Sequence, residues 1–139
     1  MNNSKAEEFT IDINLVQPSQ LYINRDKLEK IQLEYEQTGK LKTIPIKKLN
    51  QEIIFTDGHT RAFYANSIGL SEILVEWDED ELDWEMYEIC VNWCKKENIF
   101  SIKDLNSRVI SNEQYKKDWL LRCSNLSDEL SSTKKSIHQ

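Results

Sequence analysis

The chain has 139 residues, of which 39% are hydrophobic and 30% are charged, and its formal net charge is −6. This length can bury one core and this composition is too apolar for a wholly disordered chain, so we expect one compact domain with at most a small appendage. Basic residues number 9 against 11 acidic residues up to residue 77, and 9 against 13 after it, so neither half has the excess that independent binding to duplex DNA requires.

The sequence has no apolar run of about 18 residues, the length that a membrane-spanning helix needs. Its first residues also lack the basic and then apolar pattern of a signal peptide. These features predict a cytoplasmic protein without a membrane segment.

The first part of the chain reads as a strand followed by a helix. Residues 9–16 alternate apolar and polar side chains well enough for a half-buried strand. Residues 26–37 have helical apolar spacing, with Asn24 or Asp26 as the N-cap and Gly39 as the stop signal.

A hairpin, a helix and a further strand come next. Residues 44–49 and 52–56 flank a two-residue turn and predict the hairpin. A loop then leads into a helix at 61–68, and the strand at 72–77 closes the unit.

The second half of the chain is predicted to be entirely helical. Residues 84–98 form the first helix, and Ser101 and Ser111 look like N-caps of two more. We expect residues 78–126 to be a helical extension packed on the first domain. Residues 127–139 are rich in serine and lysine and predict a disordered tail.

Two features of this half are open to a metal-binding interpretation. Cys90 and Cys94 are four residues apart and Cys123 follows later, but no nearby histidine or fourth cysteine completes a zinc site, so we expect packed thiols. The acidic residues between 78 and 88 lack the glycine and spacing of a calcium loop, and we expect a solvated face ahead of a helix.

The segment from Asp57 to Arg61 is the best candidate for a functional site. A strand that passes through Asp57 and Gly58 into a helix places free N–H groups and the positive end of the helix dipole at one spot, which favours an anion. Gly58 lets a ligand approach the backbone, Thr60 offers a hydroxyl, and Arg61 can bind phosphate with two N–H groups. His59 could donate to phosphate or transfer a proton, and Asp57 could bind a metal or act as a base.

The candidate ligand-binding residues are therefore Gly58, His59, Thr60 and Arg61. Asp57 and His59 are the candidate catalytic residues, and Asp57 is the candidate metal ligand. The alternative is an ordinary turn with a capped helix, since aspartate, glycine and threonine are common in both.

Three segments, Leu15 to Pro18, Thr43 to Ile46 and Ile54 to Ala62, resemble the ParB N-terminal and sulfiredoxin-like superfamily over about residues 9–77. The resemblance implies an α+β fold with a small mixed sheet and helices, here followed by a C-terminal helical extension. Members include partition proteins that bind CTP, sulfiredoxins that use ATP, and free-serine kinases, which handle nucleotide phosphates at this loop. The resemblance therefore implies a nucleotide (ATP, ADP or CTP) with Mg²⁺.

The sequence also departs from each of these groups. His59 stands where sulfiredoxins have their nucleophilic cysteine, so sulfinic-acid reduction of that type cannot proceed. Gly58 and Arg61 match the partition proteins, but no helix-turn-helix is evident in the acidic second half. The kinase-like loop, Asp-Gly-His-His-Arg, is nearest, with Thr60 replacing one histidine and Gln20 at the place of the expected acidic residue.

The sequence thus predicts a ParB-like domain protein that binds a nucleotide or other phosphorylated small molecule at residues 57–61, with phosphoryl transfer or nucleotide hydrolysis as an open question. One alternative is a non-catalytic module that docks a protein partner through its helical half. Another is an accessory of DNA partition, which would need a basic partner or a dimer to bind DNA.

Overall fold

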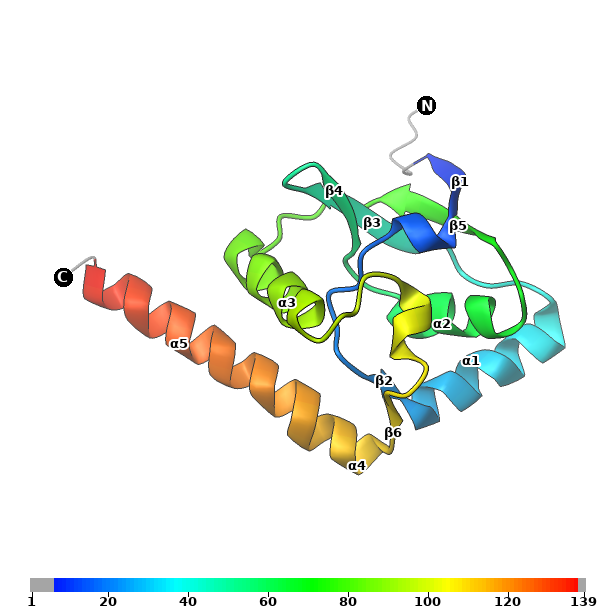
Figure 1. Ribbon diagram of the computed structural model, residues 1–139. Helices are drawn as coiled ribbons and strands as arrows, with labels where there is room; N and C mark the ends of the chain where they lie inside the picture. The colour runs from blue at the N-terminus through cyan, green and yellow to red at the C-terminus, as the bar shows by residue number, and fades with distance from the viewer. Residues whose placement is uncertain (1–6, 138–139) are drawn as a thin grey trace.

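The computed structural model describes residues 7–137, with side chains up to residue 133, and confirms the predicted α+β fold class (Figure 1). Its main sheet has the strand order β1-β5-β3-β4, with β1 at Glu8–Asp12, β5 at Glu72–Trp77, β3 at Ile44–Leu49 and β4 at Glu52–Phe55. The β1-β5 and β3-β4 pairs are antiparallel and the β3-β5 pair is parallel, so the sheet is mixed as predicted.

The predicted hairpin of β3 and β4 is confirmed, and its two turn residues have the backbone conformation that a tight connection needs. Asn50 and Gln51 both have positive φ, 52° and 71°, which is the backbone twist that two-residue hairpins prefer. The first strand is shorter than the predicted range 9–16. The side chain of Asp12 accepts a hydrogen bond from Asn14 N at 2.8 Å and starts a 3₁₀ turn, Ile13–Leu15, that ends the strand.

Two helices cover one face of the sheet in the first half of the chain. Helix α1 spans Arg25–Thr38 and ends at Gly39, which has φ 71° and donates its N–H to Tyr35 O at 2.7 Å. Helix α2 spans His59–Ser67, and Figure 1 shows it between the sheet and α1. The helix predicted at 26–37 is therefore confirmed.

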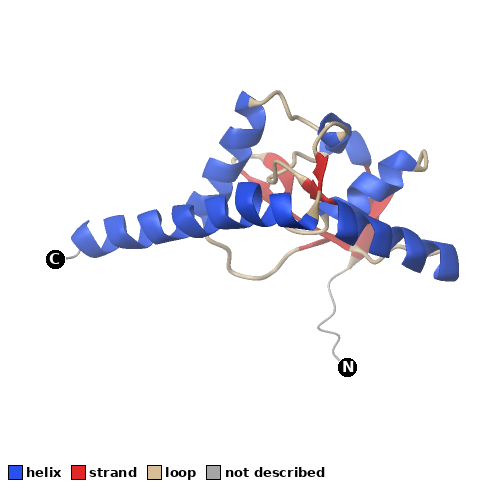
Figure 2. Cartoon of the chain, turned by 90° about the horizontal axis from the view of Figure 1, so that it is seen from below, coloured by secondary structure: helices blue, strands red, loops and turns tan. Residues whose placement is uncertain are grey.

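The second half is mostly helical. Helix α3 spans Trp84–Lys96, and a 3₁₀ turn, η2, spans Ile102–Leu105. Helix α4 (Asn112–Tyr115), the π-turn η3 (Lys116–Leu120) and helix α5 (Leu121–Ile137) then follow without a break. Figures 1 and 2 show them as one rod whose far end extends past α3.

Two expectations for this half were wrong. It is not entirely helical, because β6 (Val109–Ile110) pairs in parallel with β2 (Ile23–Asn24). The tail predicted to be disordered from residue 127 is helical up to residue 137, because Leu126 and Leu130, four residues apart, pack against the core and hold the helix. The last two residues of that predicted tail lie outside the described part.

One cluster of buried side chains holds both halves together. It includes Ile46 and Phe55 from the sheet, Phe63 from α2, Cys94 from α3 and Trp119 from the rod. The predicted division into a domain at 9–77 and an extension at 78–126 stays a proposal. Residues from both parts contribute to this one cluster.

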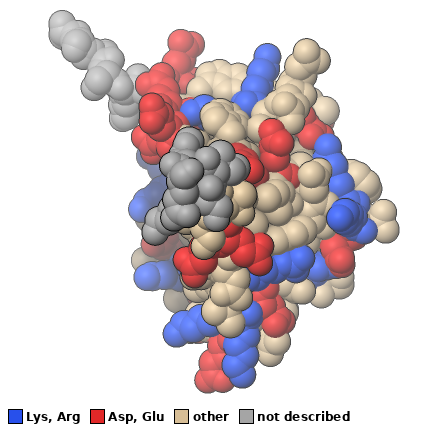
Figure 3. Space-filling view, turned by 90° about the vertical axis from the view of Figure 1, so that its left-hand side faces the viewer, with Lys and Arg blue, Asp and Glu red and all other residues tan. Residues whose placement is uncertain are grey.

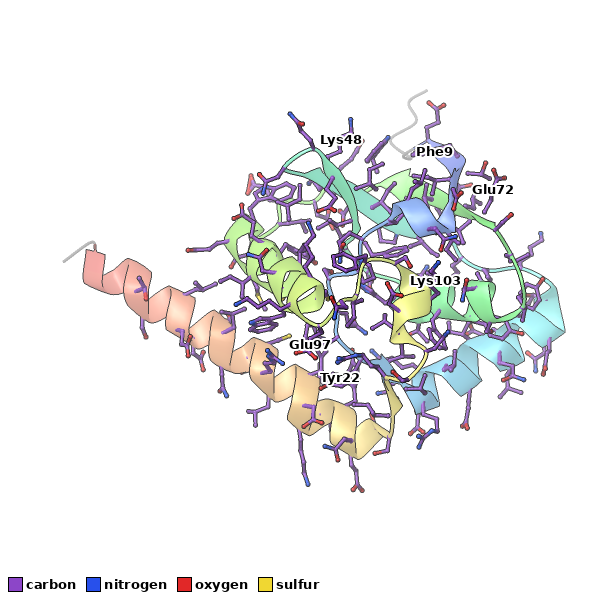
Figure 4. All side chains as sticks on the ribbon, in the orientation of Figure 1. Phe9, Tyr22, Lys48, Glu72, Glu97 and Lys103 are labelled. Carbon is purple, nitrogen blue, oxygen red and sulfur yellow. The ribbon has the colours of Figure 1, made fainter. Side chains whose placement is uncertain are left out.

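Aromatic and charged contacts join the helices of the second half to the rest. Trp93 and Trp119 meet edge to face with ring centres 6.0 Å apart, whereas Trp84 remains 38% exposed. Arg108 donates to Glu97 at 2.7 Å and lies 5.5 Å above the ring of Tyr22, and both partners are labelled in Figure 4. Among the described helices, none is long and apolar enough to span a membrane.

Candidate functional site

The predicted loop connects β4 to α2 through a glycine that no other residue replaces without strain. Gly58 has φ +75°, and its N–H donates to Asp57 Oδ1 at 2.8 Å. A Cβ atom built on Gly58 would lie 2.9 Å from Arg61 Nη2 and 3.1 Å from Ile44 Cγ2. Gly58 therefore provides both the left-handed backbone and the space in which the Arg61 guanidinium lies.

Helix α2 begins without a side-chain cap. Its N-cap residue is Gly58, and its first backbone hydrogen bond runs from Ala62 N to Gly58 O at 3.0 Å. The N–H groups of residues 59–61 precede this bond and point out of the helix end. The positive end of the helix dipole is added to these donors, so the start of α2 attracts an anion.

His59, the first residue of α2, is buried and anchors the loop from inside. Its Nε2 accepts a hydrogen bond from Ser19 N at 2.9 Å, and its ring centre lies 5.3 Å from that of Phe55. Burial lowers the pKa of His59 to about 4, although the nearby Asp57 carboxylate opposes the shift. The ring is therefore neutral near pH 7, with its proton on Nδ1. Proton transfer by His59 stays a prediction, and this pKa does not support it.

Arg61 holds its guanidinium beside the helix start. Its Nη1 donates to the Thr43 carbonyl at 2.7 Å, which fixes the side chain against the beginning of β3. Among the residues that the structure describes, Arg61 makes no ion pair. A positive charge with further N–H donors therefore faces the opening next to Gly58.

Three adjoining cavities form a groove along this region, with volumes of about 580, 290 and 180 Å³. All five predicted residues, Asp57 to Arg61, line the middle cavity. Arg61 also lines the outer, largest cavity, and Asp57 and His59 also line the inner, smallest one. The structure thus brings the predicted site residues together at the centre of the groove.

Besides Gln20 and Ile31, the middle cavity is lined by three residues that the sequence patterns did not point to. Lys27 and Lys30 reach it from α1, and Tyr115 reaches it from α4. Lys27 Nζ also lies 5.7 Å from the centre of the Tyr115 ring, within the range of a cation–π contact. The two lysines are three residues apart and share a helix face, a spacing that could have been noticed in the sequence.

Asp57 and Gln20 are polar side chains that line both the middle and the inner cavity. Asp57 is exposed, and only its Oδ1 has a hydrogen-bond partner among the described residues. Gln20 lines the middle and inner cavities and donates from Nε2 to the Tyr22 carbonyl at 2.8 Å. Among the described residues, Asp57 is therefore the one carboxylate that lines the middle cavity.

The acidic residues after β5 hold the structure around the loop. Asp78 Oδ2 accepts from Thr56 Oγ1 at 2.7 Å, and Asp83 caps α3 by accepting from Met86 N at 3.2 Å. Among the side chains of residues 7–133, no group of three or more histidine, cysteine or acidic residues is placed to hold a metal ion. Asp83 therefore lies ahead of a helix as expected, whereas Asp78 is only half exposed and binds Thr56.

No family model and no curated protein matches the sequence. Solved structures that are similar include the protein Atu1540 from Agrobacterium tumefaciens, at 15% identity and a TM-score of 0.49, covering 71% of this chain and 61% of that one. Sulfiredoxin from Arabidopsis thaliana has 12% identity and a TM-score of 0.45, covering 53% of this chain and 86% of its own.

A third similar structure is the C-terminally truncated chromosome-partitioning protein ParB from Caulobacter crescentus, complexed with CTP-gamma-S. It has 17% identity and a TM-score of 0.44, and the match covers 66% of this chain and 53% of that chain. Of these three structures, one is a sulfiredoxin and one is a ParB. The match spans about three fifths of the Agrobacterium protein and about half of this ParB.

Proposed function

We propose that the groove binds a nucleotide or another phosphorylated small molecule, with its phosphates at the start of α2. The observation that carries the proposal is the pairing of an uncapped helix start with Arg61, which makes no ion pair among the described residues. Backbone N–H groups and a guanidinium that converge on one opening are the donors that phosphate oxygens accept from.

The charges around the middle cavity support a phosphate ligand. Its lining has three basic side chains, Lys27, Lys30 and Arg61, and one acidic side chain, Asp57, so the local formal charge is 3 − 1 = +2. The whole chain has a net charge of −6, so this concentration of positive charge is local. Cationic groups around a concave opening raise the local concentration of an anionic ligand.

The inner cavity favours a ligand that has an apolar, flat part as well as phosphate. Met86, Tyr87 and Trp119 line it, and it shares Asp57 and His59 with the phosphate-binding cavity. Aromatic side chains stack readily on the faces of nucleotide bases. A nucleotide such as ATP, ADP or CTP therefore suits the groove better than inorganic phosphate does.

Asp57 and Gln20 define which reactions the groove could support. Mg²⁺ is commonly held by one or two carboxylates together with substrate phosphates, and Asp57 has one oxygen without a partner among the described residues. Gln20 cannot act as a general base, so phosphoryl transfer or nucleotide hydrolysis would depend on Asp57. We propose binding as the function and these reactions as the activities to assay.

Thermal unfolding with ATP, ADP, CTP and GTP, with and without Mg²⁺, tests the proposal. CTP is included because the similar ParB was solved with CTP-gamma-S. A ligand at 100 times its dissociation constant stabilises the folded state by about 2.7 kcal/mol, so we expect a clear rise of the midpoint with at least one nucleotide. In Arg61→Ala the affinity should fall roughly 10-fold to 100-fold, because charged hydrogen bonds contribute about 1.5–3 kcal/mol.

Arg25→Ala is the matched control, since Arg25 is an exposed arginine that does not line the groove. It should leave the nucleotide response unchanged. The double variant Lys27→Ala and Lys30→Ala should weaken binding and reduce its dependence on salt. If no nucleotide shifts the midpoint, the proposal is wrong and the protein-interaction module is favoured. If Arg61→Ala shows the same shift as the wild type, the nucleotide binds elsewhere than at the loop.

A further inference from the structure

Two cysteines from different helices meet at the wall of the inner cavity. Cys90 of α3 and Cys123 of α5 both line this cavity of about 180 Å³, and their side chains are hydrogen-bonded to each other. Cys90 is buried and Cys123 is half-buried. A small reagent that enters the inner cavity therefore reaches a pair of thiols whose sulfur atoms are already neighbours.

The hydrogen bond between the two thiols makes them chemically unequal. Donation from Cys90 lowers the pKa of Cys123, and the neighbouring Arg122 guanidinium lowers it further against the effect of burial. The same hydrogen bond and burial raise the pKa of Cys90. Cys123 is thus the sulfur that carries thiolate character, and the thiolate is the reactive form of cysteine.

Cys94 provides an internal contrast on the same helix as Cys90. It is fully buried and lines none of the three cavities of the groove. Burial raises the pKa of Cys94 to about 12. A buried thiol of this kind is inert, so the reactivity we infer belongs to the pair and not to all three cysteines.

We propose that Cys90 and Cys123 are a peroxide-reactive dithiol that closes to a disulfide between α3 and α5. The Cys123 thiolate attacks one oxygen of hydrogen peroxide, the O–O bond breaks, and a sulfenic acid and hydroxide form. The Cys90 sulfur then attacks the sulfenic sulfur, an S–S bond forms, and the oxygen leaves as water. In total, two thiols lose two electrons and two protons, and one peroxide is reduced to two waters.

The proposed disulfide would change the inner cavity. The two cysteines line this cavity together with Asp57 and His59, so a disulfide there would alter the lining that these residues share. It would also bind α5 covalently to α3, beside the contact between Trp93 and Trp119. The dithiol does not depend on nucleotide binding, and its chemistry can be tested without any ligand.

Treatment of the folded, reduced full-length protein with hydrogen peroxide tests the proposal. Thiols counted after denaturation should fall from the three free cysteines to one, with a mass loss of two hydrogens. Peptide mapping should show one cross-link, between the peptides that contain Cys90 and Cys123. Brief alkylation before oxidation should label Cys123 faster than Cys90 or Cys94.

Cys94→Ser is the matched control, and it should form the same cross-link and retain no free thiol. Cys90→Ser should stop at oxidised Cys123 without an intramolecular disulfide, and circular dichroism would confirm that each variant is folded. The wild-type result decides the matter if a variant does not fold. Three thiols that survive peroxide, a cross-link through Cys94, or cross-links only between chains would overturn the proposal.

Discussion

The two helices that border the groove begin in different ways. Helix α1 begins at a conventional cap, where Asn24 Oδ1 accepts from Asp26 N at 2.9 Å and from Lys27 N at 3.3 Å. Helix α2 begins at Gly58, which has no side chain to cap the first turn. The donors at the start of α1 are thus bound by a side chain of the protein, whereas no side chain caps those at the start of α2.

The start of α2 is nevertheless held firmly, from the inner side. His59 is hydrogen-bonded to Ser19, and Ser19 Oγ donates in turn to Phe55 O at 2.8 Å. Because α2 lacks a cap, hydrogen bonds from the buried side hold its first residue in place. In α1 the Asn24 cap both accepts hydrogen bonds from the first N–H groups and fixes the start of the helix. In α2 the buried His59 fixes the start of the helix but accepts no bond from its first N–H groups.

The largest expected effect comes from protonating His59. The pKa of its ring is about 4 in the folded state against 6.5 for the unfolded reference, so the unfolded state binds the extra proton between these values. The stability that comes from burying neutral His59 is present in full above pH 6.5 and is lost as the pH falls towards 4. Over this window the free energy of unfolding should decrease by about 3 kcal/mol, at about 1.4 kcal/mol per pH unit.

Urea unfolding at a series of pH values measures this slope, and His59→Gln is the comparison. Glutamine can still accept from Ser19 N but does not titrate, so the variant should have a flatter dependence between pH 6.5 and 5. Below pH 5 the carboxylates affect both proteins. The only other histidine, His138, lies outside the described residues. Identical slopes in the two proteins would show that His59 does not hold the start of α2 as a neutral group.

The second effect comes from adding a methyl group at the free helix start. Gly58→Ala forces a residue with Cβ into φ +75° and brings it within 2.9 Å of Arg61 Nη2. We expect about 2 kcal/mol of lost stability, of which about half is backbone strain and half the displaced hydrogen bond of Arg61. Chemical denaturation measures the stability, and the nucleotide response should weaken in the same variant because Arg61 moves.

Gly39→Ala separates the cost of backbone strain from the cost of displacing Arg61. Gly39 has φ +71°, similar to Gly58, but a Cβ atom there would meet nothing within 4 Å. This variant should lose only about 1 kcal/mol, the cost of the left-handed backbone, and should keep the nucleotide response. Equal losses in both variants would mean that the space beside Gly58 is not occupied by Arg61 as the structure shows.

The sequence predicted the loop well because its signals are local. Asp57 and Gly58 mark the turn, and helical spacing follows at once, so the strand, the turn and the start of α2 are all visible within a few residues. Lys27 and Lys30 were missed because their place in the groove depends on how α1 packs beside α2, which no local pattern specifies. The pair Cys90 and Cys123 likewise depends on α5 folding back along α3.

The two errors in the second half have different causes. The parallel pair of β2 and β6 joins residues 23–24 to residues 109–110, far apart in the sequence, and such short strands are defined by their partner and not by propensity. The helix after residue 126 was hidden by a composition rich in serine and lysine. Figure 3 shows acidic and basic side chains interspersed on this side of the molecule.

The smallest expected effect comes from removing the cap of α1. Asn24→Ala would leave the N–H groups of Asp26 and Lys27 without their acceptor and would remove the donation from Asn24 Nδ2 to Asn112 Oδ1 at 2.9 Å. Loss of an N-cap costs about 1 kcal/mol, which thermal unfolding can resolve. The nucleotide response should remain, because the cap serves α1 and lies outside the groove. If this variant instead abolished the nucleotide response while the protein stayed folded, the start of α1 would belong to the binding site. The contrast between a structural start of α1 and a ligand-binding start of α2 would then be wrong.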